Sequence, residues 1–178
     1  NVWDAFFSTR IHEALDLFEN LVLCTEISVR EAIQRKLDDR SLDMGLLTDP
    51  IKDDDFVNLL IGHFDLSLVG SRPEFDSHCN DYILVDWGIT FQKEHALYHK
   101  ISPSFKTSTA MIALEVILSK GGFAYLPKEL VESHILNKEL YMIDTALLIK
   151  RPIYMVYRKN CNNEALINQF KELLFKMQ

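Results

Sequence analysis

The chain has 178 residues, of which 48% are hydrophobic and 25% are charged, and its formal net charge is -7 at pH 7. This length and composition suffice for one buried core or for two small lobes of about 80–90 residues each. The acidic balance argues against a nucleic-acid-binding surface, which needs a basic stripe. Because no apolar run reaches membrane-spanning length and no signal-peptide pattern opens the sequence, we expect a cytoplasmic protein that contacts no membrane.

The first residues, Val2 to Phe18, predict a helix that is apolar on more than one face. Phe6 and Leu17 lie outside the main apolar stripe, whose members are Trp3, Phe7, Ile11, Ala14, Leu15 and Phe18. Such a helix is usually covered on more than one side. Two interpretations stay open: a deeply buried core helix, or a helix sandwiched between its own sheet and a partner subunit.

Two short strands and a helix are expected next. The apolar residues Leu21–Thr25 predict a buried strand, and Leu42–Leu47 predict a second one. Between them, Ser28 is expected to cap a helix that runs to about Asp38, with Glu31 completing a capping box.

The acidic run Asp53–Asp55 is expected to form a loop. No further acidic residues follow at EF-hand spacing, so a solvated turn is a better interpretation than a calcium site. Phe56–Val69 predicts two strands in close succession, broken near Gly62–Asp65. The turn residues Gly70–Pro73 then mark an expected crossing to a second lobe.

A further strand is predicted at Tyr82–Val85, with Trp87 just beyond its C-terminal end. Ligands of open α/β sheets collect at such ends, so Trp87 either lines a cleft or caps the edge of the sheet. Phe91–His99 predicts a helix, and Lys106 closes a short strand.

The histidines and cysteines indicate neither a metal nor a cofactor. His95 and His99 stand four residues apart, but the third ligand and the catalytic glutamate of an HExxH site are missing, so we interpret them as surface histidines. Cys24, Cys79 and Cys161 are odd in number and form no CxxC pair, which argues against a disulfide framework or a zinc knuckle. A reducing compartment fits this cysteine usage.

The clearest local pattern lies between Thr107 and Pro127. Apolar residues at helical spacing predict a helix that Ser108 or Thr109 can cap and that Gly121 and Gly122 can end. The short run Phe123–Leu126, apolar on both faces, predicts the interior strand of a parallel sheet.

The rest of the chain predicts a return to the first lobe. A helix is expected from Pro127 to about Ser133, followed by the extended residues Leu140–Leu148. The chain is expected to cross back near Ala146–Arg151, and Asn163–Met177 predicts a final amphipathic helix.

Four separated stretches share their pattern and their order with one protein family. Ser41–Leu47 matches a helix-following "GxLDxAI" pattern, with Arg40 in place of the usual glycine, and Gly121–Pro127 matches "GxGIxxLP". Pro152–Arg158 resembles the family's last strand, and Leu166–Leu174 its final helix. Together these stretches resemble the effector-binding domain of LysR-type transcriptional regulators.

The resemblance covers nearly the whole chain, and Val85–Gly88, with Phe91 and His95 after it, narrows it to an HdfR-like subgroup. It implies an α/β fold of two Rossmann-like lobes of the periplasmic-binding-protein type, joined by two crossover strands. Residues 1–71 and 147–178 would form lobe I, and residues 72–146 lobe II, with a small effector bound between them.

The family also places a central strand immediately before the first helix, and a winged helix-turn-helix domain before that strand. Neither is present here, so we expect a gap or a donated strand between Leu21–Thr25 and Leu42–Leu47, and DNA binding only through the missing domain. The resemblance further implies a homodimer or homotetramer. The residues expected at the dimer interface are Trp3, Phe6, Phe7, Arg10, Met111 and Leu114.

A small anion is the expected effector. The helix that follows Leu21–Thr25 should present its positive N-terminal end to the cleft. Arg30 falls where family members often place a serine or threonine, and its guanidinium can bind a carboxylate or phosphate. Alternatively, Arg30 pairs with Glu26 or Glu31 on a solvated surface. The candidate effector-binding residues are Ser28, Arg30, Thr48, Ser71, Trp87, Thr107 and Ser108.

The function expected from the resemblance is effector sensing and oligomerisation within a transcriptional regulator. A free-standing solute-binding protein of a transporter is the alternative with the same fold. An enzyme is the weakest alternative, because the sequence has no GxSxG motif, no P-loop and no GxGxxG motif after a strand.

Overall fold

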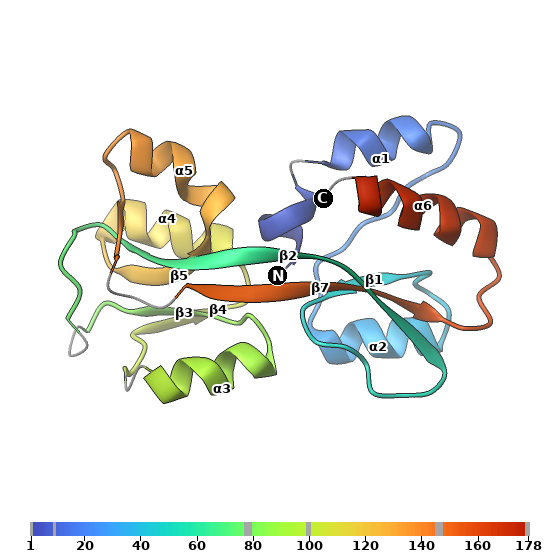
Figure 1. Cartoon of the computed structure of the whole chain (residues 1–178), viewed down its shortest axis with the longest axis horizontal. Helices are drawn as coiled ribbons and strands as arrows, with labels where there is room; N and C mark the ends of the chain where they lie inside the picture. Colours follow the sequence, from blue (N-terminus) through green and yellow to red (C-terminus); the bar gives the residue numbers. More distant parts are fainter. Residues whose placement is uncertain (1, 9, 77–79, 99–100, 145–147, 177–178) are drawn as a thin grey trace. The chain divides into compact units, whose positions relative to one another are not determined.

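The computed structural model describes residues 2–8, 10–76, 80–98, 101–144 and 148–176 (Figure 1). The helical elements are a π-helical turn η1 (Trp3–Phe7), α1 (Ile11–Leu17), α2 (Arg30–Asp38), α3 (Ile89–Tyr98), α4 (Ala110–Lys120), α5 (Lys128–Leu136) and α6 (Glu164–Lys176). The strands are β1 (Gly45–Leu47), β2 (Phe56–Gly70), β3 (Ile83–Val85), β4 (Phe105–Thr107), β5 (Phe123–Pro127), β6 (Tyr141–Met142) and β7 (Ile149–Arg158).

The chain divides into two compact units. Unit 1 consists mainly of residues 64–151 together with residues 3–5, and unit 2 consists mainly of residues 6–63 and 152–178. The unit boundaries fall inside β2 and β7, so these two long strands connect the units. The division into domains at residues 71/72 and 146/147 stays a prediction, and Ala146 and Leu147 lie outside the described residues.

Unit 1 is built around β5, whose five residues are all buried. In Figure 1, α4 and α5 lie on one side of its strands and α3 on the other. The predicted interior parallel strand is wrong in one respect, because β5 pairs antiparallel with β2, from Leu66 opposite Pro127 to Gly70 opposite Phe123. Its other edge has a single parallel bridge, between Tyr82 and Phe123. An apolar run that is buried on both faces does not reveal the direction of its neighbours.

The turn between α4 and β5 depends on two glycines with positive φ. Gly121 ends α4 at φ 82°, as predicted, and Gly122 follows at φ 124°. A Cβ on Gly122 would lie 2.4 Å from the carbonyl oxygen of Asp81. That oxygen accepts a hydrogen bond from the N–H of Phe123 at 3.1 Å, so it is fixed in place.

Unit 2 places α1 and α6 on one side of its strands and α2 on the other (Figure 1). β1 pairs antiparallel with β7, from Gly45 opposite Val156 to Leu47 opposite Tyr154. Between α2 and the strands lies a core of Leu37, Leu47, Ile51, Phe56 and Val156.

Arg158 ties three parts of unit 2 together. Its guanidinium donates to the Asp38 carboxylate at 2.9 Å and to the Asp55 carboxylate at 3.0 Å, and it lies 5.7 Å from the centroid of the Phe56 ring. Within the acidic run, Asp53 accepts the N–H of Asp55 at 2.9 Å. The acidic run is therefore a turn, as predicted.

The expected strand at Leu21–Thr25 is wrong. These residues form no strand, and Val22 is 91% exposed. An apolar stretch becomes a buried strand only where a neighbouring strand pairs with it, and no strand of the described residues does so. β1 is correspondingly at the end of the strand order β1-β7-β2-β5, and among the described strands it pairs with β7 alone.

The expected single helix from Val2 to Phe18 is also wrong, because the helical geometry changes after Phe7. In a continuous α-helix the Phe6 carbonyl would accept the N–H of Arg10. Here the Arg10 guanidinium donates a hydrogen bond to the Phe6 carbonyl oxygen at 2.8 Å. The main-chain N–H of Arg10 donates to the Phe7 carbonyl oxygen at 3.0 Å instead.

Two smaller expectations also differ. The predicted capping box is absent: α2 has Val29 as its N-cap residue, with no side-chain cap, and Ser28 donates to Glu26 at 3.3 Å. The predicted break near Gly62–Asp65 is absent as well, because β2 runs through it as a single strand of 15 residues.

Candidate functional site

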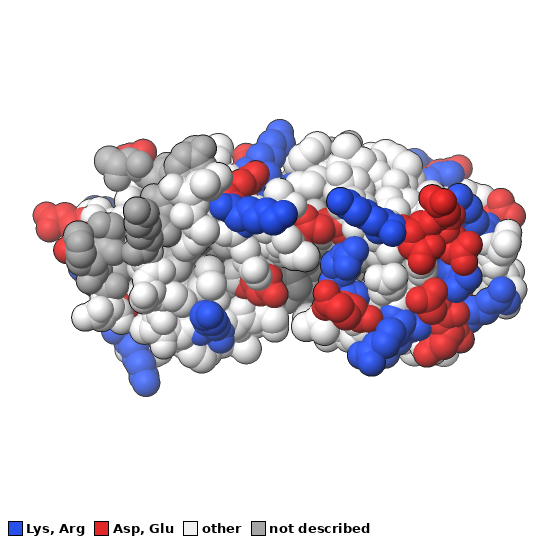
Figure 2. Space-filling view, turned by 90° about the horizontal axis from the view of Figure 1, so that it is seen from below, with Lys and Arg blue, Asp and Glu red and all other residues white. Residues whose placement is uncertain are grey.

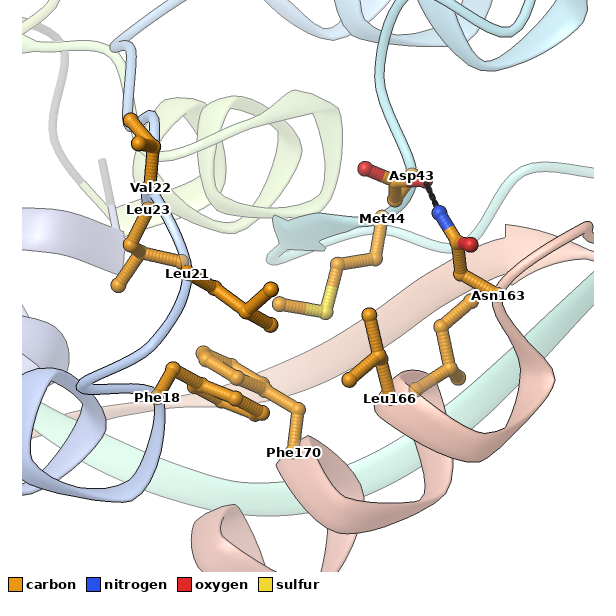
Figure 3. A pocket seen from close by; sticks show the side chains of 10 residues that line it. Phe18, Leu21, Val22, Leu23, Asp43, Met44, Asn163, Leu166 and Phe170 are labelled. Carbon is orange, nitrogen blue, oxygen red and sulfur yellow. Dashed lines mark hydrogen bonds between the residues drawn. The ribbon is translucent and has the colours of Figure 1, made fainter.

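An apolar pocket of about 130 Å³ opens in unit 2, between the C-terminal end of α1, the residues that follow it and α6 (Figure 3). It is lined by Phe18, Leu21, Val22, Leu23, Asp43, Met44, Asn163, Leu166, Ile167 and Phe170. A cavity of this size accommodates a group about as large as a benzene ring.

Aromatic stacking holds one wall of the pocket. Phe170 of α6 stacks on Phe18 with ring centroids 5.8 Å apart and an interplanar angle of 12°, and its ring also lies 5.8 Å from that of Phe7. α6 has the amphipathic pattern that the sequence predicted, and Ile167, Phe170 and Leu174 are its buried residues. The wall therefore forms because α1 and α6 bury their apolar faces against each other.

Two of the lining residues, Asp43 and Asn163, have polar side chains. Asn163 donates a hydrogen bond to the Asp43 carboxylate at 2.9 Å (Figure 3). The lining contains no lysine, arginine or histidine. The pocket therefore suits apolar groups and offers a small anion no opposite charge.

The predicted effector residues of unit 2 lie around the start of α2 and after β1. Arg30 donates to the Pro50 carbonyl at 2.9 Å and is paired with neither glutamate of the alternative interpretation, since Glu26 binds Lys36 instead. The hydrogen bond from Lys36 lowers the pKa of the Glu26 carboxyl. Thr48 is half-buried after β1.

A second candidate position for binding a ligand is the N-terminus of α4 in unit 1. Asp4, only 8% exposed, accepts hydrogen bonds there from the N–H groups of Ala110 at 2.8 Å and Met111 at 3.4 Å. The predicted cap residue Thr109 makes no side-chain cap bond. The first turn of α4 therefore holds a carboxylate that comes from a residue 106 positions earlier.

The predicted effector residues of unit 1 have mixed environments. Thr107 accepts the N–H of Thr109 at 3.2 Å next to the α4 N-terminus, and Ser108 is exposed beside it. Ser71 accepts the N–H of Gly122 at 3.1 Å. Trp87 is only 1% exposed and donates its indole N–H to the Tyr125 carbonyl at 3.0 Å, so its ring is packed within unit 1.

The residues predicted at a dimer interface divide into covered and accessible ones. Phe6, Phe7 and Leu114 are buried within the chain, so they cannot form an outer surface in this structure. Trp3 and Arg10 are half-buried, and Met111 is 47% exposed. Their role at an interface between copies stays a prediction, because an apolar helix face does not reveal whether its cover comes from the same chain.

His95 was expected on the surface and is buried instead. Its ring stacks on Tyr82 at 5.3 Å and lies 5.5 Å from Phe91 and 6.0 Å from Tyr125. Burial also raises the pKa of Tyr125 to about 12. His99 lies outside the described residues, as does Cys79, while Cys24 and Cys161 are free.

The described residues contain no group of three histidine, cysteine, aspartate or glutamate side chains that could hold a metal ion. None of the helices described is long and apolar enough to cross a membrane. Figure 2 shows acidic and basic side chains interspersed on one face of the molecule, without a continuous basic stripe on that face.

Sequence reasoning missed the apolar pocket and the role of Asp4, although it named Thr107 and Ser108 beside the second position. The pocket residues were visible as apolar faces, but their convergence depends on how α1 and α6 pack. The sequence gives one local indication of the role of Asp4, which is an acidic residue between the apolar residues Trp3 and Phe6. No neighbouring residue indicates that its hydrogen-bond partner is the N-terminus of α4.

The sequence has relatives among transcriptional regulators. It is 28% identical to the HTH-type transcriptional regulator HdfR of Yersinia enterocolitica, and to that of Yersinia pestis, over 95% of this chain and 61% of each relative. Full-length HypT of Salmonella typhimurium, a hypochlorite-specific LysR-type transcriptional regulator, matches with a TM-score of 0.73 at 14% identity, over 96% of this chain and 64% of that one. This chain is related to the LysR-type transcriptional regulators. The expected resemblance, with its HdfR-like subgroup, is confirmed.

Solved regulatory domains of LysR-type regulators share the fold. The bromide-bound domain of HypT matches with a TM-score of 0.77 at 14% identity, covering 97% of this chain and 91% of that one. A sulfate-bound OxyR2 regulatory domain from Vibrio vulnificus gives a TM-score of 0.74 at 19% identity, covering 99% and 92%. The predicted fold class is thereby confirmed. No family model matches the sequence.

Proposed function

We propose that this chain is the effector-sensing and oligomerisation part of a LysR-type transcriptional regulator that acts in the cytoplasm. The observation that carries the proposal is the match to HdfR along 95% of the chain, together with the regulatory-domain fold. The chain spans about 61% of the length of these relatives, so DNA binding is assigned to another part of the longer protein. These matches favour a regulator over a free-standing solute-binding protein and over an enzyme.

Coupling between effector and DNA tests this function. The product of the complete gene should bind DNA from its own upstream region, measured by fluorescence anisotropy. A compound that raises the melting temperature of the 178-residue chain should change that DNA affinity by about 5- to 150-fold, the range of typical allosteric coupling. A complete gene product that binds this DNA with the same affinity at every concentration of the compound would contradict the proposal.

The proposed effector is a small anion, bound near the N-terminus of α4 with Thr107 and Ser108 as hydroxyl donors. Support comes from Asp4, whose carboxylate already receives the N–H groups of Ala110 and Met111. Helix N-termini favour negative charge because of their N–H donors and positive dipole end, and since Asp4 already supplies that charge here, an effector anion would have to take the place of its carboxylate. The HypT and OxyR2 domains named above were solved with bromide and sulfate, respectively. The roles of Ser28, Arg30, Thr48, Ser71 and Trp87 as effector contacts stay predictions.

Replacing Asp4 tests whether this position takes an anion. Asp4→Ala should lower the free energy of unfolding by about 1 kcal/mol, the usual effect of losing a helix cap. Acetate or sulfate should then raise the melting temperature of Asp4→Ala more than that of the unchanged chain, because the vacated N–H groups can bind the added anion. Thermal unfolding at constant ionic strength, with chloride as reference, measures both effects.

The matched control is Asp16→Ala, which removes one negative charge from α1 in unit 2. Acetate and sulfate should affect this variant as they affect the unchanged chain. The anion proposal fails if Asp4→Ala responds to these salts no more strongly than Asp16→Ala.

Oligomerisation is proposed to use the outer face of α4. Met111, Ile112 and Leu118 are 47%, 48% and 41% exposed along this helix. An isologous contact between two copies would cover such a face on both partners at once.

A further inference from the structure

Asp4 joins the π-helical turn η1 to the first turn of α4. It is only 8% exposed, and its carboxylate accepts the main-chain N–H groups of Ala110 at 2.8 Å and Met111 at 3.4 Å. Ala110, the first residue of α4, is fully buried, so this end of the helix is enclosed. The chain therefore supplies, from one of its own side chains, the negative charge that a helix N-terminus favours.

η1 is the segment in which the chain passes from one unit to the other. Trp3–Ala5 belongs to unit 1, and the residues from Phe6 to His63 belong to unit 2. The Arg10 guanidinium holds the second part of the turn, because it donates to the Phe6 carbonyl oxygen at 2.8 Å and lies 4.8 Å from the centroid of the Phe6 ring. Asp4 holds the first part on α4. π-helical turns are rare and often occur at functional sites.

A hydroxyl group at the same helix end has unused hydrogen-bonding capacity. Thr109 is the N-cap residue of α4, and its Oγ1 is buried without a hydrogen-bond partner among the described residues. A buried polar group without a partner usually indicates that a ligand or water can reach it. A free anion has more acceptor directions than a tethered carboxylate, so it can bind this hydroxyl together with the two N–H groups of α4.

We propose that Asp4 is a built-in competitor of the anionic effector, and that its displacement transmits effector binding to η1. This inference rests on the proposed function, which places the anion at the N-terminus of α4. The anion and the Asp4 carboxylate require the same two N–H groups, and two negative charges at one helix end repel each other. The two therefore occupy the position in turn.

Displacement moves η1 and not the Asp4 side chain alone. A buried carboxylate that loses these two hydrogen bonds is unfavourable, so its charge has to move toward water. The aspartate side chain has a single methylene group, and the neighbouring residues Ala5 and Phe6 are buried. Rotation in place would leave the charge enclosed, so the first part of η1 leaves α4 together with the carboxylate.

The same competition sets the affinity for the effector. The apparent dissociation constant equals the intrinsic constant divided by the fraction of molecules in which the position is vacant. Loss of one helix cap corresponds to a factor of about five in this equilibrium. Asp4→Ala should therefore bind sulfate about fivefold more tightly in calorimetry. The reduced affinity of the chain with Asp4 is the counterpart of the coupling, since a ligand that binds two states equally shifts neither.

Hydrogen exchange with sulfate as the probe tests the displacement. Sulfate is raised at constant ionic strength against chloride, and exchange is followed in η1 and, as an internal reference, in α6. In the chain with Asp4, sulfate should speed exchange in η1 by at least about fivefold without speeding exchange in α6. In Asp4→Ala, η1 should already exchange at the fast rate in chloride, and sulfate should speed it no further.

Two control variants accompany the test. Asp16→Ala removes a negative charge elsewhere, and its η1 should respond to sulfate as that of the chain with Asp4 does. Asp4→Asn keeps a side-chain oxygen that can accept the N–H of Ala110, so its η1 should stay protected in chloride. Exchange of η1 that is as fast in Asp4→Asn as in Asp4→Ala would show that these hydrogen bonds do not hold the turn. Circular dichroism confirms that all the variants fold.

The outcomes separate this inference from the proposed function. If sulfate raises the melting temperature of Asp4→Ala no more than that of Asp16→Ala, the anion position itself fails and this inference fails with it. If sulfate stabilises Asp4→Ala selectively but does not speed exchange of η1 in the chain with Asp4, the anion position stands and the displacement of Asp4 is overturned.

Discussion

Replacing Gly122 with alanine is expected to lower the free energy of unfolding by about 3 kcal/mol or more, through backbone strain and steric conflict together. Gly122 has a φ of 124°, which residues with a Cβ rarely adopt. The new Cβ would lie 2.4 Å from the Asp81 carbonyl oxygen, a main-chain atom that cannot move without breaking its bond to Phe123. Urea unfolding followed by circular dichroism measures the loss.

Gly45→Ala is the matched control. Gly45 has no positive φ, and its added Cβ would meet the Ile33 side chain at 2.7 Å, where a side-chain adjustment relieves the conflict. We expect a loss of about 1 kcal/mol, at the low end of overpacking effects. Equal losses for the two variants would show that the turn after α4 does not depend on the main-chain geometry of Gly122.

Trp87→Ala is expected to lower the free energy of unfolding by about 3–5 kcal/mol, the usual range for truncating a buried aromatic residue. Trp87 is 1% exposed, and its ring lies 5.5 Å from that of Phe64. Trp87→Phe keeps most of the volume but leaves the Tyr125 carbonyl without its indole donor, which should cost about 1–3 kcal/mol. Chemical unfolding of both variants measures the two losses, and the loss for Trp87→Ala should be the larger.

The same two variants decide between the two interpretations of Trp87 that the sequence left open. If Trp87 only packs against the sheet, Trp87→Phe should bind a stabilising effector with unchanged affinity in calorimetry. A large loss of affinity combined with an unchanged free energy of unfolding would instead identify Trp87 as a wall of the effector site.

Local patterns predicted the elements whose cause is local. α4 was predictable because its apolar spacing, its two terminal glycines and the following proline all lie within one stretch of sequence. β5 was predictable as a buried strand for the same reason. Its antiparallel pairing was not, because the direction of a neighbour depends on β2, more than 50 residues earlier.

The wrong predictions concern elements whose structure depends on residues far away in the sequence. Leu21–Thr25 has the composition of a strand but forms none, since no described strand pairs with it. The helix expected from Val2 to Phe18 is interrupted where the Arg10 guanidinium donates a hydrogen bond to the Phe6 carbonyl oxygen. A pattern of apolar periodicity cannot reveal this hydrogen bond. The α4 cap was sought in Ser108 and Thr109 because caps are usually local, whereas Asp4 provides it.

The same dependence on distant residues limits the prediction of binding residues. Thr107 and Ser108 do lie at the start of α4, where their position follows directly from the helix. Trp87 was expected near a strand end and lies there, but its burial depends on Phe64 and Tyr125. The apolar pocket was not predicted, because it exists only once the residues after α1 and those of α6 are brought together.

The arrangement around Arg158 has a consequence for how this sequence can drift in evolution. One guanidinium neutralises two carboxylates, Asp38 and Asp55, that are far apart in sequence. A lineage that loses Arg158 first would leave two negative charges close together beside Phe56, whereas a lineage that loses one aspartate first keeps a balanced pair. Substitutions at these three positions should therefore follow a preferred order, with an aspartate replaced before the arginine.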